Sequence, residues 1–419
     1  MTLLHAGFVL APLVLCLAFQ IFYEYLLPYG PAVDIPPNRR PTTSDVDTSN
    51  ESLRLSPRGK LTKIYERFEY DGRVAEPLLI GPETIFFDSS GKMFAINERS
   101  NLISITDIRP QDSGNSGDQS VMYGTVKEEA YLGVGRQLSG KFDSRGCLYF
   151  SDVIVGLARI CNKQGKFGHV EQVCSRVRRG DTWSSVNYVD DIDIDAKSGH
   201  VYFTAATDTL VDRHPFSRQW DLLYASKLEG LSGRRTGLLL RYKPETNEVD
   251  VLAEDVAFAN GVAISREGTH VLYTSTFEAR VFKLSLTTGV KEELLVGQLP
   301  GLVDGTDCSH RTGLCYAAIP ATLPALPKFV MTLPSSFGII VRTFLLMLPR
   351  SLSPKQDPYA AVAEFHPGDL DTAAYVTRLW QDPDGKDISM VTGVTVHGER
   401  VYIGTLNGNY IGVLNLRDD

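Results

Sequence analysis

Four oxygen-bearing side chains stand at matching places in the sequence, each just ahead of a short apolar segment. They are Glu83 in GPETIFFD, Asp190 in VDDIDID, Asn260 in FANGVAIS and Asp304 in LVDGTDC. Carboxylate and amide oxygens are the ligands of hard cations such as Ca²⁺, which takes about six to eight of them. Asn260 would supply an oxygen without adding charge, and Gly261 and Gly305 would let the backbone come close. The pattern predicts a calcium site, provided that the four segments converge.

Two alternatives to this assignment stay open. Asx side chains also cap turns, and for any single residue that structural role is the simpler one. Asn187 stands three residues before Asp190 and would replace it as a ligand if the strand register were shifted. With Asp190 in place, the set holds three carboxylates, which favours a divalent cation and would raise the pKa of one carboxyl without it.

The elements that must position these residues form a repeat. The pattern apolar-x-Asp-x-x-Gly-x-apolar-aromatic is clear at 86–96, 141–152 and 192–205, and weaker at 263–275, 305–319 and 394–405. Each copy predicts a strand, a tight glycine turn and a second strand. Spacings of roughly 45 to 85 residues suit four-stranded units, and six of them closing a circle make a six-bladed β-propeller. Inner strands then surround one channel, with KIYERFEY (63–70) completing the last blade beside GNYIGVLNL.

The N-terminal part differs in kind from this all-β region. Residues 2–23 contain no charged side chain, about the length that crosses a bilayer as a helix. We therefore expect an anchor at 1–27, a linker at 28–60 with a glycosylation sequon at Asn50, and the propeller at 61–419. A cleaved signal peptide is the alternative. The expectation is a single-pass membrane protein that contacts membrane lipid through this helix. Its propeller would be lumenal or extracellular, at the endoplasmic reticulum or plasma membrane.

An apolar insertion at about 320–352 interrupts the fifth unit. Within it, Phe337 to Leu348 is apolar nearly all round, with Arg342 as the sole charge. Twelve residues are too few to span a bilayer. The insertion is interpreted either as a buried lid helix or as an interfacial helix near the mouth of the site.

The cysteines offer two candidate disulfides. Cys161 and Cys174 flank a plausible hairpin turn, and Cys308 and Cys315 flank another, which leaves Cys147 over. Disulfides would suit a lumenal or extracellular domain, and buried free thiols are the alternative.

The overall composition excludes several function classes. A net charge of −8, a pI near 5.6 and the lack of a basic aromatic patch argue against nucleic-acid binding. The sequence contains no P-loop, no GxGxxG after a strand, no HExxH and no GxSxG.

The motifs together resemble the strictosidine synthase-like family, and in layout its membrane-anchored members. The likeness is carried by GPE, VDDIDIDAKSGHVYFT, GLLLRYKPETNEVDVLAEDVAFANGVAIS, LPGLVDGTDC and a late DPDG, in order from about residue 60. More distantly the pattern resembles paraoxonases and gluconolactonases. The resemblance implies a six-bladed propeller with a divalent ion at its centre. It also implies that the protein hydrolyses esters or lactones.

Some residues that are typical of these families are missing from this sequence, and their absence limits the reactions that the protein can be expected to catalyse. In the last unit, the stretch ISMVTGVTVHGERVYIGT has no acid before Glu399, so a strictosidine-type lyase ranks last. The paraoxonase histidine pair is also missing from RQLSGKFD. The leading hypothesis is an arylesterase-like hydrolase of small lipophilic esters or lactones. In it Asp304 binds the ion and acts as base or nucleophile, and Arg136 orients the substrate. A non-catalytic propeller that binds a protein or lipid partner is the alternative, kept open by Ala205, where the family has a carboxylate.

Overall fold

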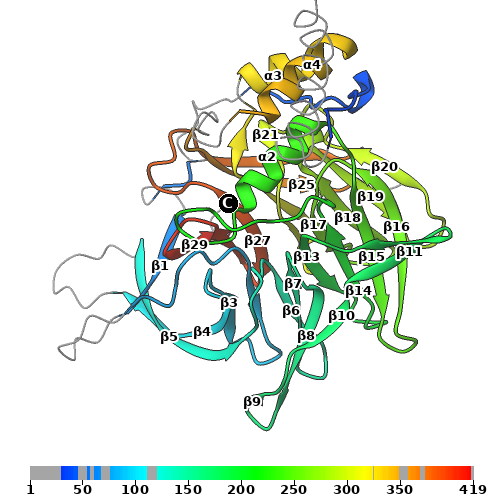
Figure 1. Cartoon of the computed structure of the whole chain (residues 1–419). Coiled ribbons are helices and arrows are strands. Elements are labelled where there is room, and N and C mark those ends of the chain that lie inside the picture. The colour runs from blue at the N-terminus through cyan, green and yellow to red at the C-terminus, as the bar shows by residue number, and fades with distance from the viewer. Residues whose placement is uncertain are drawn as a thin grey trace, which may run out of the picture.

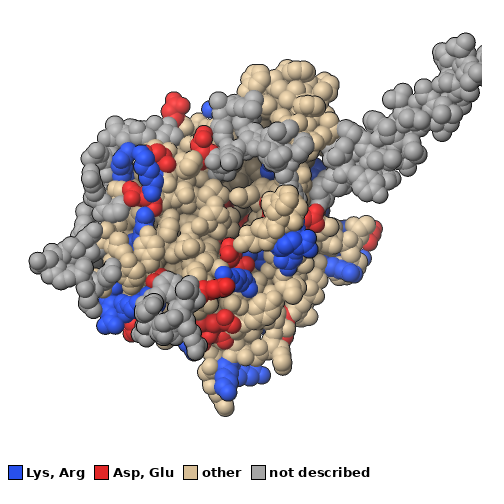
Figure 2. Space-filling view, turned by 60° about the vertical axis from the view of Figure 1, so that its left-hand side comes forward, with Lys and Arg blue, Asp and Glu red and all other residues tan. Residues whose placement is uncertain are grey.

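The protein is mostly β, with a few helices gathered at one end (Figure 1). The computed structural model describes residues 30–45, 54–56, 61–67, 76–110, 120–323, 325–348, 357–368 and 373–416. The predicted anchor at 1–27 and the sequon at Asn50 lie outside the described residues. On the face shown in Figure 2, side chains of both charge signs are interspersed over a largely uncharged surface.

The largest sheet joins the first and the last parts of the chain. Its eight strands follow the order β2, β3, β4, β5, β1, β29, β28, β27. They are β1 (Leu61–Glu66), β2 (Ile85–Phe87), β3 (Met93–Ile96), β4 (Asn101–Pro110), β5 (Val121–Tyr131), β27 (Val391–His397), β28 (Arg400–Thr405) and β29 (Tyr410–Asn415).

The middle of the chain forms further antiparallel sheets in sequence order. The first contains β6 (Gly140–Phe142), β7 (Cys147–Asp152), β8 (Gly156–Lys163) and β10 (Glu171–Cys174), with β9 (Lys166–Phe167) beside β8. The next two contain β13 (Val189–Ile194), β14 (Val201–Ala205), β15 (Gly237–Lys243) and β16 (Glu248–Val256), then β17 (Ala259–Ile264), β18 (His270–Ser275), β19 (Arg280–Ser285) and β20 (Lys291–Leu294). Another contains β22 (Thr306–Cys308), β23 (Cys315–Ile319), β25 (Ala360–His366) and β26 (Tyr375–Asp382). Two small hairpin-like sheets pair β11 (Arg176–Arg179) with β12 (Thr182–Ser185), and β21 (Gly301–Leu302) with β24 (Ala321–Thr322).

The innermost strands contact one another around a ring, in the order β2, β6, β13, β17, β22, β27 and back to β2. The hydrophobic core follows the same ring, because most of its large clusters lie between two consecutive sheets and another lies between the first and last parts of the eight-stranded sheet. Phe86 and Phe150 share one cluster, for example, and Tyr149 and Phe203 share the next. Alternate side chains of a strand point to opposite faces of its sheet, so each sheet packs against both neighbours. The arrangement is propeller-like.

Each predicted strand–turn–strand repeat is a hairpin in the structure, as in β2–β3, β6–β7 and β13–β14. Asp88 shows why the repeated Asp and Gly mark these turns. Its carboxylate accepts hydrogen bonds from the backbone N–H groups of Ser90 and Lys92, and Gly91 takes a φ of +80° that favours glycine.

Closure of the ring depends on β1. It pairs antiparallel with β29, as the sequence predicts, with Ile64 opposite Ile411. It also pairs in parallel with β5, with Ile64 opposite Met122. The second pairing was not predicted, and it makes β1 the strand that joins the two ends of the chain.

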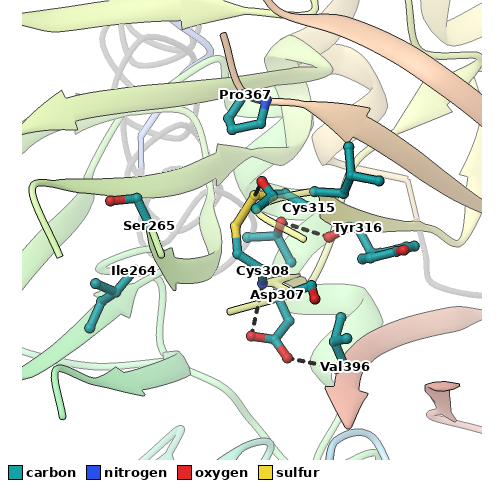
Figure 3. The surroundings of a disulfide bond; sticks show 12 residues. Ile264, Ser265, Asp307, Cys308, Cys315, Tyr316, Pro367 and Val396 are labelled. Carbon is teal, nitrogen blue, oxygen red and sulfur yellow. Dashed lines mark hydrogen bonds between the residues drawn. A yellow bond between two sulfur atoms is a disulfide. The ribbon is translucent and has the colours of Figure 1, made fainter. Parts of the chain in front are cut away.

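The cysteines pair differently from the prediction in one case. The structure contains the Cys308–Cys315 disulfide, whose two residues are directly opposite on β22 and β23 (Figure 3). Cys161, however, bonds to Cys147, its direct partner across β7 and β8. The predicted Cys161–Cys174 pair is wrong because Cys174 on β10 lies opposite Leu157, and Cys174 remains a buried free thiol.

Three helices lie together at one end of the ring (Figure 1): α2 (Leu222–Ser232), α3 (Ala325–Thr332) and α4 (Ser335–Leu346). Described residues of the predicted linker pack against them. The Val33 N–H donates to Ser232 O at 2.7 Å, and the Arg40 guanidinium donates to Thr332 O at 3.2 Å. Residues 30–45 are therefore part of the packed structure.

No helix in the described part of the chain combines the length and the apolar character needed to cross a bilayer. This finding contradicts the predicted single-pass membrane localisation. The anchor on which that prediction rested, residues 1–27, lies outside the described residues.

Candidate metal centre

The predicted oxygen-bearing side chains meet at the helix-bearing end of the channel. Carboxylate oxygens of Glu83, Asp190 and Asp304 all lie within 4.8 Å of one another. The Asn260 side chain hydrogen-bonds to the Asp304 carboxylate and so joins the group. Asp190, and not the alternative Asn187, is the residue that takes part.

Local backbone irregularities aim these side chains into the channel. The register of β13 shifts between Val189 and Ile192, and that of β17 shifts between Ala259 and Val262, which brackets Asp190 and Asn260. An extra residue of this kind bends a strand and re-aims a side chain, as often happens beside functional sites.

Glycines let neighbouring sheets come close at this level. A Cβ on Gly261 would lie 2.4 Å from Thr306 N, and one on Gly305 would lie 2.6 Å from Thr392 O. The Thr274 hydroxyl donates to Asp304 O at 2.8 Å and fixes that segment from the preceding sheet. Gly261 and Gly305 therefore have the role that the sequence suggested, close approach of the backbone.

The carboxylates are almost fully removed from water. Glu83, Asp190 and Asp304 are 6%, 5% and 8% exposed. Burial raises the pKa of Glu83 to about 7 and the pKa values of Asp190 and Asp304 well above the ordinary range, and the nearby carboxylates add to the shift. Glu83 Oε2 and Asp304 Oδ1 have no hydrogen-bond partner among the described residues.

This donor set fits a hard divalent cation. Several buried, acceptor-only oxygens around one point lack donors, and a cation satisfies them and offsets their mutual repulsion. The neighbouring Asp191 is tied elsewhere, since it accepts hydrogen bonds from the Ser139 hydroxyl at 2.7 Å and from the Val262 N–H at 3.0 Å.

Calcium binding is expected to strengthen as the pH rises from about 5 to about 8, because the ion must displace protons from carboxyls whose pKa values are raised. The same shifts mean that these carboxyls favour the folded, metal-free chain most below the ordinary carboxyl pKa of about 4. The contribution of Glu83 to stability is lost as the pH rises through its raised pKa of about 7. Titration calorimetry at several pH values measures the first effect. An affinity that does not change with pH would contradict this picture of the site.

Arg136 lies beside the cluster, as we call Glu83, Asp190, Asn260 and Asp304, but backbone carbonyl groups accept its hydrogen bonds. Its guanidinium donates to Gly81 O and Gln137 O, both at 2.8 Å, and to Asn97 O at 3.2 Å. It is 5% exposed, and burial lowers its pKa although Glu83 opposes the shift. These contacts tie together the loops around the cluster, and its predicted role in orienting the substrate stays a prediction.

The sequence did not reveal which residues cover the cluster. Tyr188 and Phe258, each two residues before a cluster member, take the left-handed φ values of 45° and 65° and pack edge to face. Non-glycine residues hold such conformations at a cost, commonly beside functional sites. Leu222 and Ala225 of α2 complete this apolar cover.

The predicted insertion lies further out than expected. Its helix α4 packs on α2, with Leu346 against Leu228 and Leu231, so α2 forms the inner layer. The Arg342 side chain is 2% exposed and donates to Leu231 O at 3.4 Å. Phe337, Ile340 and Phe344 are 56%, 65% and 58% exposed, so α4 is not buried all round.

The loop between β14 and α2 spans the same end of the channel. Trp220 donates its indole N–H to Val134 O at 2.9 Å, and the Gln219 amide donates to Glu98 at 3.2 Å. The loop, residues 206–221, thus reaches from its own sheet to the loops before β6 and after β3. We call residues 206–232, which also include α2, the lid.

Comparisons with known proteins bear on this arrangement. Residues 190–288 match the family model described as strictosidine synthase. The chain resembles strictosidine synthase-like proteins. Strictosidine synthase-like 2 of Arabidopsis thaliana is 29% identical over 47% of this chain and 50% of that protein, so this match spans half of the relative. Adipocyte plasma membrane-associated protein of Salmo salar is 25% identical over 87% of this chain and 83% of that protein.

Among solved structures, a gluconolactonase from Xanthomonas campestris aligns with a TM-score of 0.50 and 13% identity. The alignment covers 92% of this chain and 97% of that chain. The similarity thus extends over nearly the whole fold, and the match to the strictosidine synthase family model includes Asp190 and Asn260. The family resemblance expected from the sequence is confirmed.

Proposed function

We propose that this chain is a metal-dependent hydrolase of esters or lactones, built as a six-bladed propeller around a calcium ion or a similar divalent cation. Glu83, Asp190, Asn260 and Asp304 would hold the ion. A structure with a similar fold is a gluconolactonase, which supports a lactone as one substrate class.

The observation that carries the proposal is the set of three buried carboxylates with oxygens within 4.8 Å of one another. A structural role alone would leave Glu83 Oε2 and Asp304 Oδ1 satisfied by protein donors, and they have none among the described residues. When bound, the cation supplies a Lewis acid that polarises the substrate carbonyl and stabilises the developing oxyanion.

Asp304 is the base in this proposal. Its free Oδ1 takes a proton from the attacking water, while the hydrogen bond from Asn260 steadies the carboxylate. The water oxygen bonds to the carbonyl carbon, the bond from that carbon to the ester oxygen breaks, and the proton passes to the leaving oxygen. Products are a carboxylic acid and an alcohol, or a hydroxy acid from a lactone.

The lid favours a lipophilic substrate. Leu210, Phe216 and Leu223 of the lid are 57%, 89% and 48% exposed, and Val134 beneath it is 66% exposed. Apolar side chains at the end of the channel that holds the cluster would desolvate an apolar acyl or alkoxy group as it enters. The cover of Tyr188, Phe258 and α2 would keep bulk water from the reacting atoms.

The direct test uses the purified protein after a chelator has removed its metal. Hydrolysis of a panel of aryl esters and lactones is measured before and after each divalent cation is added back. Activity that chelation abolishes and calcium restores is the expected result. Calcium binding without hydrolysis of any panel member would contradict the hydrolase and favour the binding propeller. Activity that survives complete removal of metal would contradict the role of the ion.

A further inference from the structure

Thr392 lies near the start of β27, the last inner strand. Its position there is equivalent to the positions of the cluster residues beside the other inner strands. Inner-strand residues Ile192, Val262, Thr306 and Val394 pair with Phe203, Tyr273, Ala317 and Ile403 at the same level of their hairpins. Two residues before them stand Asp190, Asn260, Asp304 and Thr392. Thr392 was not among the ligands predicted from the sequence, because that prediction considered only carboxylate and amide side chains.

The strand irregularity is repeated as well. β27 shifts register between Val391 and Gly393, with Thr392 as the extra residue, as β13 and β17 do at Asp190 and Asn260. Thr392 therefore stands at the same place in its bulge as Asp190 and Asn260 do in theirs, and such bulges commonly re-aim the side chain.

Backbone contacts place Thr392 between two cluster members. The Gly261 N–H donates to Asp304 O at 3.3 Å, and the Gly305 N–H donates in the same way to Thr392 O at 2.8 Å. On its other side, a Cβ on Gly393 would lie 2.1 Å from Glu83 O. Thr392 is therefore the link of the ring between Asp304 and Glu83.

The hydroxyl of Thr392 has no partner in the described part of the chain, although the residue is only 3% exposed. Asp304 Oδ1 and Glu83 Oε2 are equally unpartnered. A threonine side chain is shorter than an aspartate, so its oxygen stops short of the point that the carboxylates reach. A water molecule, which both donates and accepts, fits between a hydroxyl and a carboxylate.

We propose that Thr392 is a positioning residue that holds the attacking water between its Oγ1 and the Asp304 carboxylate. This inference rests on the proposed function, in which Asp304 takes the proton from that water. Holding the water in line with the carbonyl supplies orientation that Asp304 alone cannot give.

A crystal structure of the calcium-loaded wild-type chain tests the placement without reference to activity. We expect an ordered water within hydrogen-bond distance of both Thr392 Oγ1 and Asp304, and its loss in Thr392→Val. A Thr392 hydroxyl that binds the ion directly, or that donates to a protein group, would overturn the inference. A bridging water in a chain that hydrolyses nothing would leave the placement standing and would refute only the proposed function.

Kinetics test the role. Thr392→Val, which keeps the side-chain shape, should lower kcat about 10- to 100-fold with little change in KM or calcium affinity, because an unheld water is badly oriented. Thr392→Ser should restore most of the rate. Thr395→Val, the same change three residues along β27, is the control and should retain wild-type kcat. Equal rates in Thr392→Val and wild type, or a loss that follows the melting temperature, would overturn the inference.

Discussion

Asp304→Asn should lower ester or lactone turnover about 10²- to 10⁴-fold, the range that general-base catalysis contributes. The amide keeps an oxygen for the ion but cannot accept a proton from water. Calcium affinity should fall only modestly, because one charge is lost from several oxygen contacts. Steady-state kinetics at saturating calcium, together with titration calorimetry, separate the two effects.

Asn260→Ala is the matched variant with the opposite signature. It removes a ligand and leaves the base, so calcium should bind more weakly and excess calcium should partly restore activity. If both variants lose activity only in proportion to their folded fraction, the ion is structural and Asp304 is not the base.

Gly404→Ala should destabilise the fold by about 4 kcal/mol or prevent folding, among the largest effects of a single substitution. A Cβ at this position would lie 1.7 Å from Glu83 O and 2.3 Å from the Glu83 carbonyl carbon. The collision is with backbone on the neighbouring inner strand segment, and backbone cannot swing aside as a side chain can. Urea unfolding followed by tryptophan fluorescence measures the loss.

Gly168→Ala is the control for this substitution. Its Cβ would lie 3.6 Å from Cys161 O, an ordinary contact, so the free energy of unfolding should change by less than about 1 kcal/mol. A Gly404→Ala protein as stable as the control would show that β28 and the segment before β2 are not held as closely as described.

The fold was predictable because its repeating unit has a strong local signature. In the three clear copies, local hydrogen bonds and positive φ require the Asp and Gly of the hairpin turn, as at Asp88 and Gly91, so these residues recur in the sequence. The cluster was predictable from the same repeat. Each of its members, Glu83, Asp190, Asn260 and Asp304, stands at the same position relative to an inner strand.

Features set by exact register or by distant contacts were not predictable. Cys161 joins Cys147 because the two are directly opposite, and the same strand borders Cys174 on its other side. Spacing alone could not choose between them. The Arg136 guanidinium was expected to face a substrate, yet it donates to the carbonyls of the adjacent Gln137 and of two distant residues, Gly81 and Asn97. No local pattern announces such long-range contacts.

The double pairing of β1 has a consequence for biosynthesis. Its partners are β5, close behind it in the chain, and β29, which ends at Asn415. The ring therefore cannot close before β29 has been synthesised, because β29 is one of the two partners of β1. Until then β1 has an open edge that can pair with strands of other chains. Such long-range closure makes a late, slow folding step, and nascent copies depend on being kept apart until it is complete.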